Sequence, residues 1–124
     1  MATIVHFDIS AEVPERAKKF YTELFGWKMG TLDGFPDYYE IETADTKGVK
    51  GVGGGLTKRD DPLQNGIVNF IGVDSLSDTL TKLVALGGRV IQPRQAMPGY
   101  GYIAVCADTE NNTFGLFQDD KNAR

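Results

Sequence analysis

The feature of this sequence that most constrains its fold is an internal repeat at half the chain length. When the 124-residue chain is shifted by 62 residues, its two halves align without a gap. Identical residues then coincide at several positions, among them Ile9 and Ile71, Gly26 and Gly88, Pro36 and Pro98, Tyr38 and Tyr100, Ile41 and Ile103, and Gly53 and Gly115. Self-similarity at a fixed period is typical of chains built from copies of one supersecondary unit. The repeat therefore predicts two copies of one such unit.

The order of patterns within each half indicates what that unit is. Each half opens with a strand pattern, over 4–9 and over 67–73. Amphipathic helix patterns follow over 13–24 and 76–84, and we expect them to end at Gly26 and at Gly87 and Gly88. Three short strands are then predicted in each half, near 27–31, 38–44 and 50–57 and near 89–92, 100–106 and 113–118. Each half is thus predicted to be a β-α-β-β-β module, and the fold class to be α+β.

The length of the chain is typical of one domain, so residues 1–124 are predicted to form a single domain. Its first module covers about 1–57, and its second covers about 67–119. The polar segment 58–66 between them contains proline and glycine and is interpreted as a linker.

Composition and charge exclude several classes of function. The formal net charge is −4, without the basic face that nucleic-acid binding needs. No apolar run approaches the ~20 residues of a membrane helix, and no signal peptide is recognisable. Cys106 is the single cysteine, so no internal disulfide can form, and we interpret it as a buried, inert thiol. These features favour a cytoplasmic protein whose partners are neither nucleic acids nor membranes.

Alternation along the strands predicts which side chains face away from the helices. Val5, Phe7 and Ile9 are expected to face the helices, as are Ile41, Ile103, Phe114 and Leu116. The other face is then predicted to carry His6, Asp8, Tyr38, Glu40, Glu42, Val68, Phe70, Tyr100, Tyr102, Ala104, Cys106 and Phe117. Aromatic walls with a few ionisable groups are characteristic of small-molecule pockets. The glycines of Gly51–Gly55 are interpreted as room beside the floor of such a pocket, or as bulges.

Several stretches resemble the vicinal oxygen chelate superfamily, which includes glyoxalase I, bleomycin resistance proteins, extradiol dioxygenases and methylmalonyl-CoA epimerase. They are Val5-His-Phe-Asp-Ile9, Ala17-Lys-Lys-Phe-Tyr-Thr-Glu-Leu-Phe-Gly-Trp27, Val73-Asp-Ser-Leu76, Leu86-Gly-Gly-Arg-Val-Ile91 and Asp108-Thr-Glu-Asn-Asn-Thr-Phe-Gly-Leu-Phe117. The resemblance implies that eight strands form an open, U-shaped sheet around a ligand or metal. It also makes a homodimer plausible.

The same resemblance implies where a metal would bind. Metal enzymes of the superfamily typically take His, Glu, His and Glu ligands from the first and last strands of each half. Carried over, these positions fall on His6, near Gly53, on Val68 and near Gly115, so only the first is retained. Stable metal sites use three or more protein ligands. We therefore expect no cofactor, and a divalent metal only if the site has been relocated.

Candidate roles follow for individual residues, each with a structural alternative. His6, Asp8 and Glu40 are candidates for proton transfer, since imidazole and carboxylates are common acid–base groups. Alternatively, His6 is a packed strand histidine, and Glu40 and Glu42 lie on a strand whose face is exposed to solvent. Tyr38, Glu42, Val68, Phe70, Tyr100, Tyr102 and Phe117 are candidates for ligand contacts, although strand propensity alone also explains tyrosines.

Three functions remain open from the sequence. The first is a small-molecule binding protein of the bleomycin-resistance kind, whose metal site is degenerate. The second is a lyase or isomerase of the same superfamily that moves protons through His6, Asp8 or Glu40. The third is a scaffold or interaction subunit whose cleft is vestigial.

Overall fold

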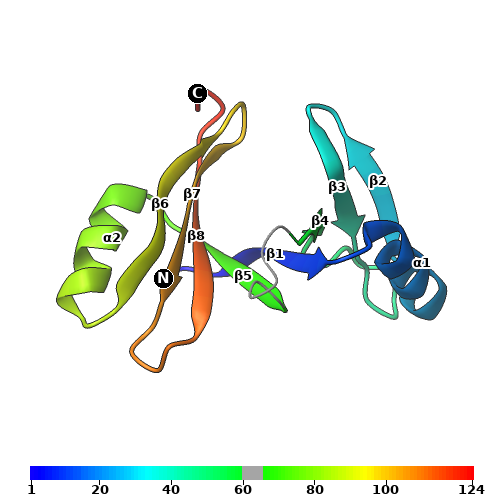
Figure 1. Ribbon diagram of the computed structural model, residues 1–124, viewed down its shortest axis with the longest axis horizontal. Coiled ribbons are helices and arrows are strands. Elements are labelled where there is room, and N and C mark those ends of the chain that lie inside the picture. Colours follow the sequence, from blue (N-terminus) through cyan, green and yellow to red (C-terminus); the bar gives the residue numbers. More distant parts are fainter. Residues whose placement is uncertain (60–65) are drawn as a thin grey trace. The chain divides into compact units, whose positions relative to one another are not determined.

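The structure is a computed structural model that describes residues 1–59 and 66–124 (Figure 1). Its elements follow the order β1 (Ile4–Ala11), α1 (Pro14–Phe25), β2 (Lys28–Leu32), β3 (Phe35–Glu42), β4 (Gly54–Lys58), β5 (Ile67–Gly72), α2 (Leu76–Ala85), β6 (Arg89–Met97), β7 (Gly101–Ala107) and β8 (Thr113–Asp119). The predicted α+β fold with two β-α-β-β-β modules is therefore confirmed.

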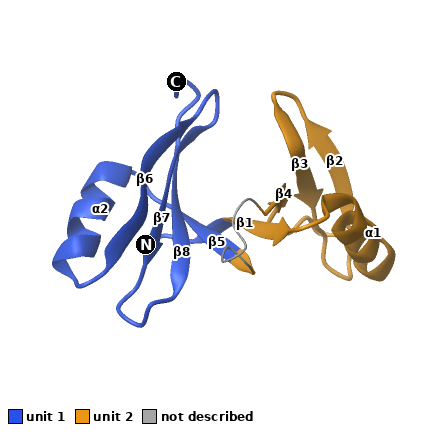
Figure 2. Cartoon of the chain, viewed as in Figure 1, with its two compact units in different colours: residues 1–5, 68–124 blue, residues 6–67 orange. Residues whose placement is uncertain are grey.

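The chain forms two compact units (Figure 2). Unit 2 comprises His6–Ile67, and its strands follow the order β2-β3-β4-β1. Unit 1 comprises Met1–Val5 and Val68–Arg124, and its strands follow the order β5-β8-β7-β6. In both units the first and last strands of the module pair in parallel, while the other pairs are antiparallel. The predicted linker 58–66 begins inside β4, and its residues 60–65 lie outside the described part of the chain.

In unit 2, local signals set the limits of α1. Pro14 occupies the first turn, where its missing N–H costs nothing because that group has no helical partner. Gly26 ends the helix in the left-handed conformation, at φ 73°, and its N–H donates to the Thr22 carbonyl. The buried core below the helix consists of Ile9, Ala11, Ile41 and Leu56, with Ala17 and Tyr21 of α1 packed against it. The predicted orientation of Phe7, Ile9 and Ile41 is confirmed, whereas Val5 is 41% exposed.

In unit 1, Ser75 caps the N-terminus of α2, because its Oγ accepts from the Asp78 N–H at 3.2 Å. The core on this side consists of Leu76, Ala104, Cys106 and Leu116, with Leu80 and Leu83 of α2 packed against it. Cys106 is fully buried, and burial raises the pKa of its thiol because it disfavours the charged thiolate. The predicted burial of this thiol is confirmed.

The orientation predicted for β7 is wrong. Tyr102, Ala104 and Cys106 pack on the α2 side, so Ile103 points away from the helix. Strand pairing shows the cause: Tyr39 pairs with Leu56, and Ala104 pairs with Leu116. The two modules are offset here by 65 residues, not by the 62 of the gapless alignment. Side chains alternate along a strand, and the two offsets, 65 and 62, differ by an odd number. The gapless alignment therefore assigned each β7 side chain to the wrong face of the sheet.

Strand limits also differ from those predicted. β4 begins at Gly54, not at residue 50, because Lys50 forms only an isolated bridge with Ala44. β6 continues to Met97 through Pro93, which an edge strand accommodates since one row of its N–H groups faces no partner. Among the described residues, no helix is long and apolar enough to cross a membrane.

Candidate functional site

The face of unit 2 that points away from α1 carries most of the polar side chains singled out in the sequence. Strand register places Asp8 of β1 beside Gly55 of β4, and Gly55 beside Glu40 of β3. Paired residues in adjacent strands point to the same face. Asp8, Gly55 and Glu40 therefore form one row across this face, with the glycine between the two carboxylates. We call this surface the polar face. Sequence reasoning missed Ser10 and Thr57, which pair in the next row.

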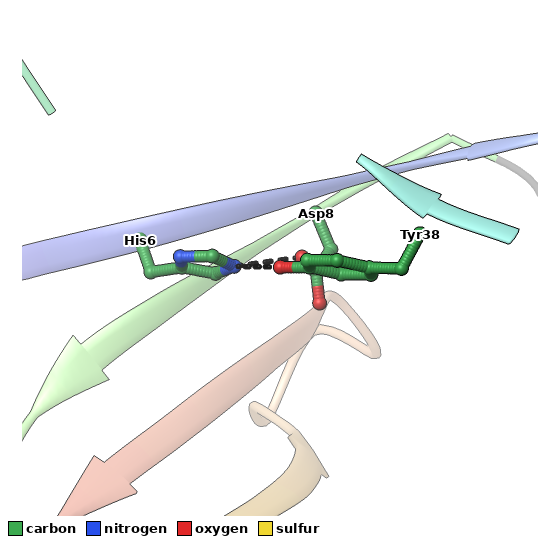
Figure 3. A network of polar contacts seen from close by, with 3 residues as sticks. All are labelled: His6, Asp8 and Tyr38. Carbon is green, nitrogen blue, oxygen red and sulfur yellow. Dashed lines mark hydrogen bonds and ion pairs between the residues drawn. The ribbon is translucent and has the colours of Figure 1, made fainter. Parts of the chain in front are cut away.

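His6, Asp8 and Tyr38 form a hydrogen-bonded network on the polar face (Figure 3). His6 Nε2 lies 2.7 Å from Asp8 Oδ1 and 3.4 Å from Tyr38 Oη. A carboxylate only accepts hydrogen bonds, so Nε2 carries the hydrogen that it donates to Asp8. In the neutral ring Nδ1 is then the acceptor nitrogen, and in the protonated ring the contact becomes an ion pair. The side chains of His6 and Asp8 are 34% and 28% exposed, so solvent reaches both.

Tyr38 reaches the histidine because Gly55 lies beneath its ring. A Cβ atom at Gly55 would collide with the hydroxyl and the outer ring carbons of Tyr38. A glycine at this position therefore lets the phenol of a β3 residue extend across β4 toward His6 of β1. The glycine run was visible in the sequence, but which of its members lies under an aromatic ring depends on the register.

The structure separates the two glutamates of β3, which the sequence left equivalent. Glu42 pairs with Lys28 of β2, so an opposite charge faces it across the strands. Glu40 pairs with Gly30 on one side and Gly55 on the other, so no side chain faces it from either neighbouring strand. Both residues are exposed. Glu40 therefore has open space on its Gly30 side, whereas the Tyr38 ring lies over Gly55 on the other side.

The corresponding face of unit 1 has aromatic side chains at its centre. Phe70 is 5% exposed and lies over Gly115, where a Cβ atom would collide with its ring. Phe117 pairs with Ile103 and has its ring beside Gly101. The predicted orientation of Phe70 and Phe117 away from α2 agrees with these contacts, and Val68 shares their face by alternation. The middle of this face therefore offers aromatic packing surface, and Asp119, which pairs with Gly101, adds a carboxylate at the end of β8.

The two remaining candidate tyrosines lie in different surroundings. Tyr102 packs against the core under α2, and Arg94 lies over its ring at 3.9 Å from the centroid. Tyr100 precedes β7 in a turn and is 48% exposed. Its role in binding stays a prediction, and the predicted pocket-facing position of Tyr102 is wrong.

The strand register also identifies which glycines occupy the two positions where the resemblance implies a glutamate metal ligand. Ile9 pairs with Leu56 and Ile71 with Leu116, so Gly55, not Gly53, corresponds to Gly115. At both positions an aromatic ring, that of Tyr38 or that of Phe70, fills the space that a larger side chain would need. Within 1–59 and 66–124, no group of three or more His, Cys, Asp or Glu side chains is placed to hold a metal ion.

Comparison with known proteins agrees with the fold described above. A family model described as a glyoxalase-like domain matches residues 4–117. The protein named "Putative glyoxylase CFP32" from Mycobacterium bovis is 27% identical over 120 residues, which cover 93% of this chain and 45% of that protein. The chain thus spans about half the length of the curated relatives it matches.

Solved structures share the fold. A glyoxalase/bleomycin resistance protein/dioxygenase superfamily member from Vibrio splendidus superposes with a TM-score of 0.67 at 11% identity, covering 97% of this chain and 100% of that one. Methylmalonyl-CoA epimerase from Mycobacterium tuberculosis superposes with a TM-score of 0.64 at 14% identity, covering 94% of this chain and 87% of that one. At these identities the likeness establishes the fold alone.

Proposed function

Because this chain belongs to the glyoxalase-like domain family, we propose that it binds a small organic molecule on its polar face without a bound metal. The observation that carries the proposal is that an aromatic ring lies over each of Gly55 and Gly115, the two positions where a glutamate ligand would be needed. A glutamate cannot be accommodated at Gly55 or Gly115 while Tyr38 and Phe70 keep their positions. The residues present therefore do not fit the four-ligand set, and His6 is the one family ligand retained.

The polar face has the chemistry that a small ligand needs. Tyr38 offers an aromatic surface, and its hydroxyl lies 3.4 Å from His6 Nε2, the nitrogen that also contacts Asp8. His6 and Asp8 are partly exposed, so they can exchange water for ligand contacts. Glu40 adds a carboxylate bordered by glycines. A few polar groups around an aromatic wall set the orientation of a ligand in the manner of small-molecule sites.

The proposal predicts ligand binding that depends on Tyr38 and His6 but not on metal. The measurement is a thermal-shift screen of organic compounds on chelator-treated protein, followed by calorimetry of each hit. We expect Tyr38→Leu and His6→Ala each to weaken binding by about tenfold, since each removes a ligand contact worth roughly 1.4 kcal/mol. Glu23→Gln is the control and should leave the affinity unchanged, because Glu23 is exposed on α1, on the opposite side of the sheet. Saturable binding of Zn²⁺, Ni²⁺, Mn²⁺ or Fe²⁺ at micromolar concentration, lost in His6→Ala, would contradict a metal-free site.

A second candidate function is a lyase or isomerase that moves a proton at an acidic C–H bond. The 2.7 Å contact of His6 with Asp8 favours it, because a carboxylate partner fixes the tautomer of a catalytic imidazole. Structural neighbours that are methylmalonyl-CoA epimerases make this reaction class a natural one to test.

This second function predicts that the protein exchanges the acidic hydrogen of methylmalonyl-CoA for deuterium from the solvent. The exchange is measured by mass spectrometry. We expect the exchange rate to fall about 100-fold in Glu40→Gln or His6→Ala, as is typical when a general acid or base is removed. Glu42→Gln should keep the rate, because Glu42 pairs with Lys28. The absence of exchange by the unaltered protein would exclude this substrate and leave binding as the proposed role.

The homodimer and the cytoplasmic location stay predictions.

A further inference from the structure

The hairpin that joins β2 to β3 contains a hollow of about 320 Å³, lined by residues 31–39. Its origin lies in the strand register. Thr31 pairs with Tyr39, but Leu32 pairs with Phe35, so β3 contains extra residues opposite this step of β2 and bulges there. Asp37 adopts the left-handed conformation, at φ 62°, within this bulge. The volume is at the small end of ligand sites and suits one ring or head group.

The chemistry of this hollow is aromatic and anionic. The rings of Phe35 and Tyr38 lie with their centroids 6.2 Å apart, tilted by 52°. Residues 31–39 include Asp33 and Asp37 and contain no lysine, arginine or histidine. Tyr39, which also lines the hollow, already has the ammonium group of Lys18 at 4.8 Å from its ring centre. Aromatic faces and carboxylates both attract cations and disfavour anions.

We propose that this hollow is a subsite for a cationic head group, an ammonium or amidinium, of the ligand bound on the polar face. The inference rests on the proposed function and names the ligand class. Tyr38 connects the two surfaces, because it lines the hollow and also contacts His6. A ligand with a positive charge at one end and a polar group at the other would contact both.

The test uses benzamidine as the probe and neutral benzamide of nearly the same shape as its control. The full chain, labelled with ¹⁵N, is titrated with each compound and followed by NMR. We expect benzamidine to bind at least about fivefold more tightly than benzamide, and to shift the resonances of 31–39. The double variant Asp33→Asn/Asp37→Asn should lose about fivefold in affinity for benzamidine. Asparagine also tolerates the left-handed backbone at position 37, so this variant is expected to fold normally.

The matched control is Glu12→Gln/Glu23→Gln, which removes two exposed carboxylates outside 31–39 and should leave the affinity for benzamidine unchanged. Equal binding of both compounds, or equal loss of affinity in the two double variants, would overturn the subsite. The two proposals fail separately. The proposed function fails if no compound in the screen depends on His6 and Tyr38, whereas the subsite fails if the preference for a cation does not depend on Asp33 and Asp37.

Discussion

Replacing Gly115 with alanine is expected to lower the free energy of unfolding by about 2 kcal/mol, the usual magnitude for an overpacked interior. The added Cβ would collide with the ring of Phe70, at atoms near its attachment point as well as at its edge. Phe70 is 5% exposed, so it cannot turn into solvent to make room. The measurement is equilibrium unfolding in urea, with the midpoint and slope of the transition compared between variants.

Gly30→Ala is the matched control for this prediction. Gly30 also lies in a strand, but no atom lies within 4 Å of the position of its added Cβ. Its replacement should therefore change stability by no more than about 0.5 kcal/mol. A double variant, Gly115→Ala with Phe70→Leu, should recover part of the loss, since a smaller side chain removes the collision. If Gly115→Ala and Gly30→Ala were equally stable, the Phe70 ring could not be filling the space over Gly115 that a carboxylate side chain would need.

Replacing Leu56 with alanine should destabilise the protein by about 3 kcal/mol. Leu56 has no exposed surface and is packed among Ile9, Ala11 and Ile41 at the centre of the unit 2 core. Removing its isobutyl group leaves a cavity between β4 and α1. The same strand carries Gly55, so we also expect weaker ligand binding on the polar face. Urea unfolding monitored by the fluorescence of Trp27, which packs against this core, reports the change.

Leu24→Ala provides the comparison, because Leu24 belongs to the same unit and is 58% exposed on α1. Alanine is at least as good a helix former as leucine, so this variant should lose less than about 0.5 kcal/mol. If both leucine variants lost the same stability, the assignment of Leu56 to a closed core would be wrong.

Much of the fold followed from the sequence because its signals are local. The cap at Ser75, the proline at the start of α1 and the glycine at its end each act within one helical turn. Alternation in β1 placed His6 and Asp8 on one face, and the repeat predicted two modules of one design. The resemblance to the vicinal oxygen chelate superfamily is likewise confirmed by the matching family model.

What the sequence could not decide depends on contacts between distant strands. The offset between modules is 62 residues at Ile9 and Ile71 but 65 at Tyr39 and Ala104, and this odd difference reversed the orientation of Tyr102. Register also distinguishes Glu40 from Glu42 and places Tyr38 over Gly55. Helix limits are set by neighbours in the chain, whereas strand register is set by insertions, bulges and side-chain packing between segments far apart in sequence. The chain alone therefore determined the modules and their helices, and only the tertiary structure determined which side chains meet on the polar face.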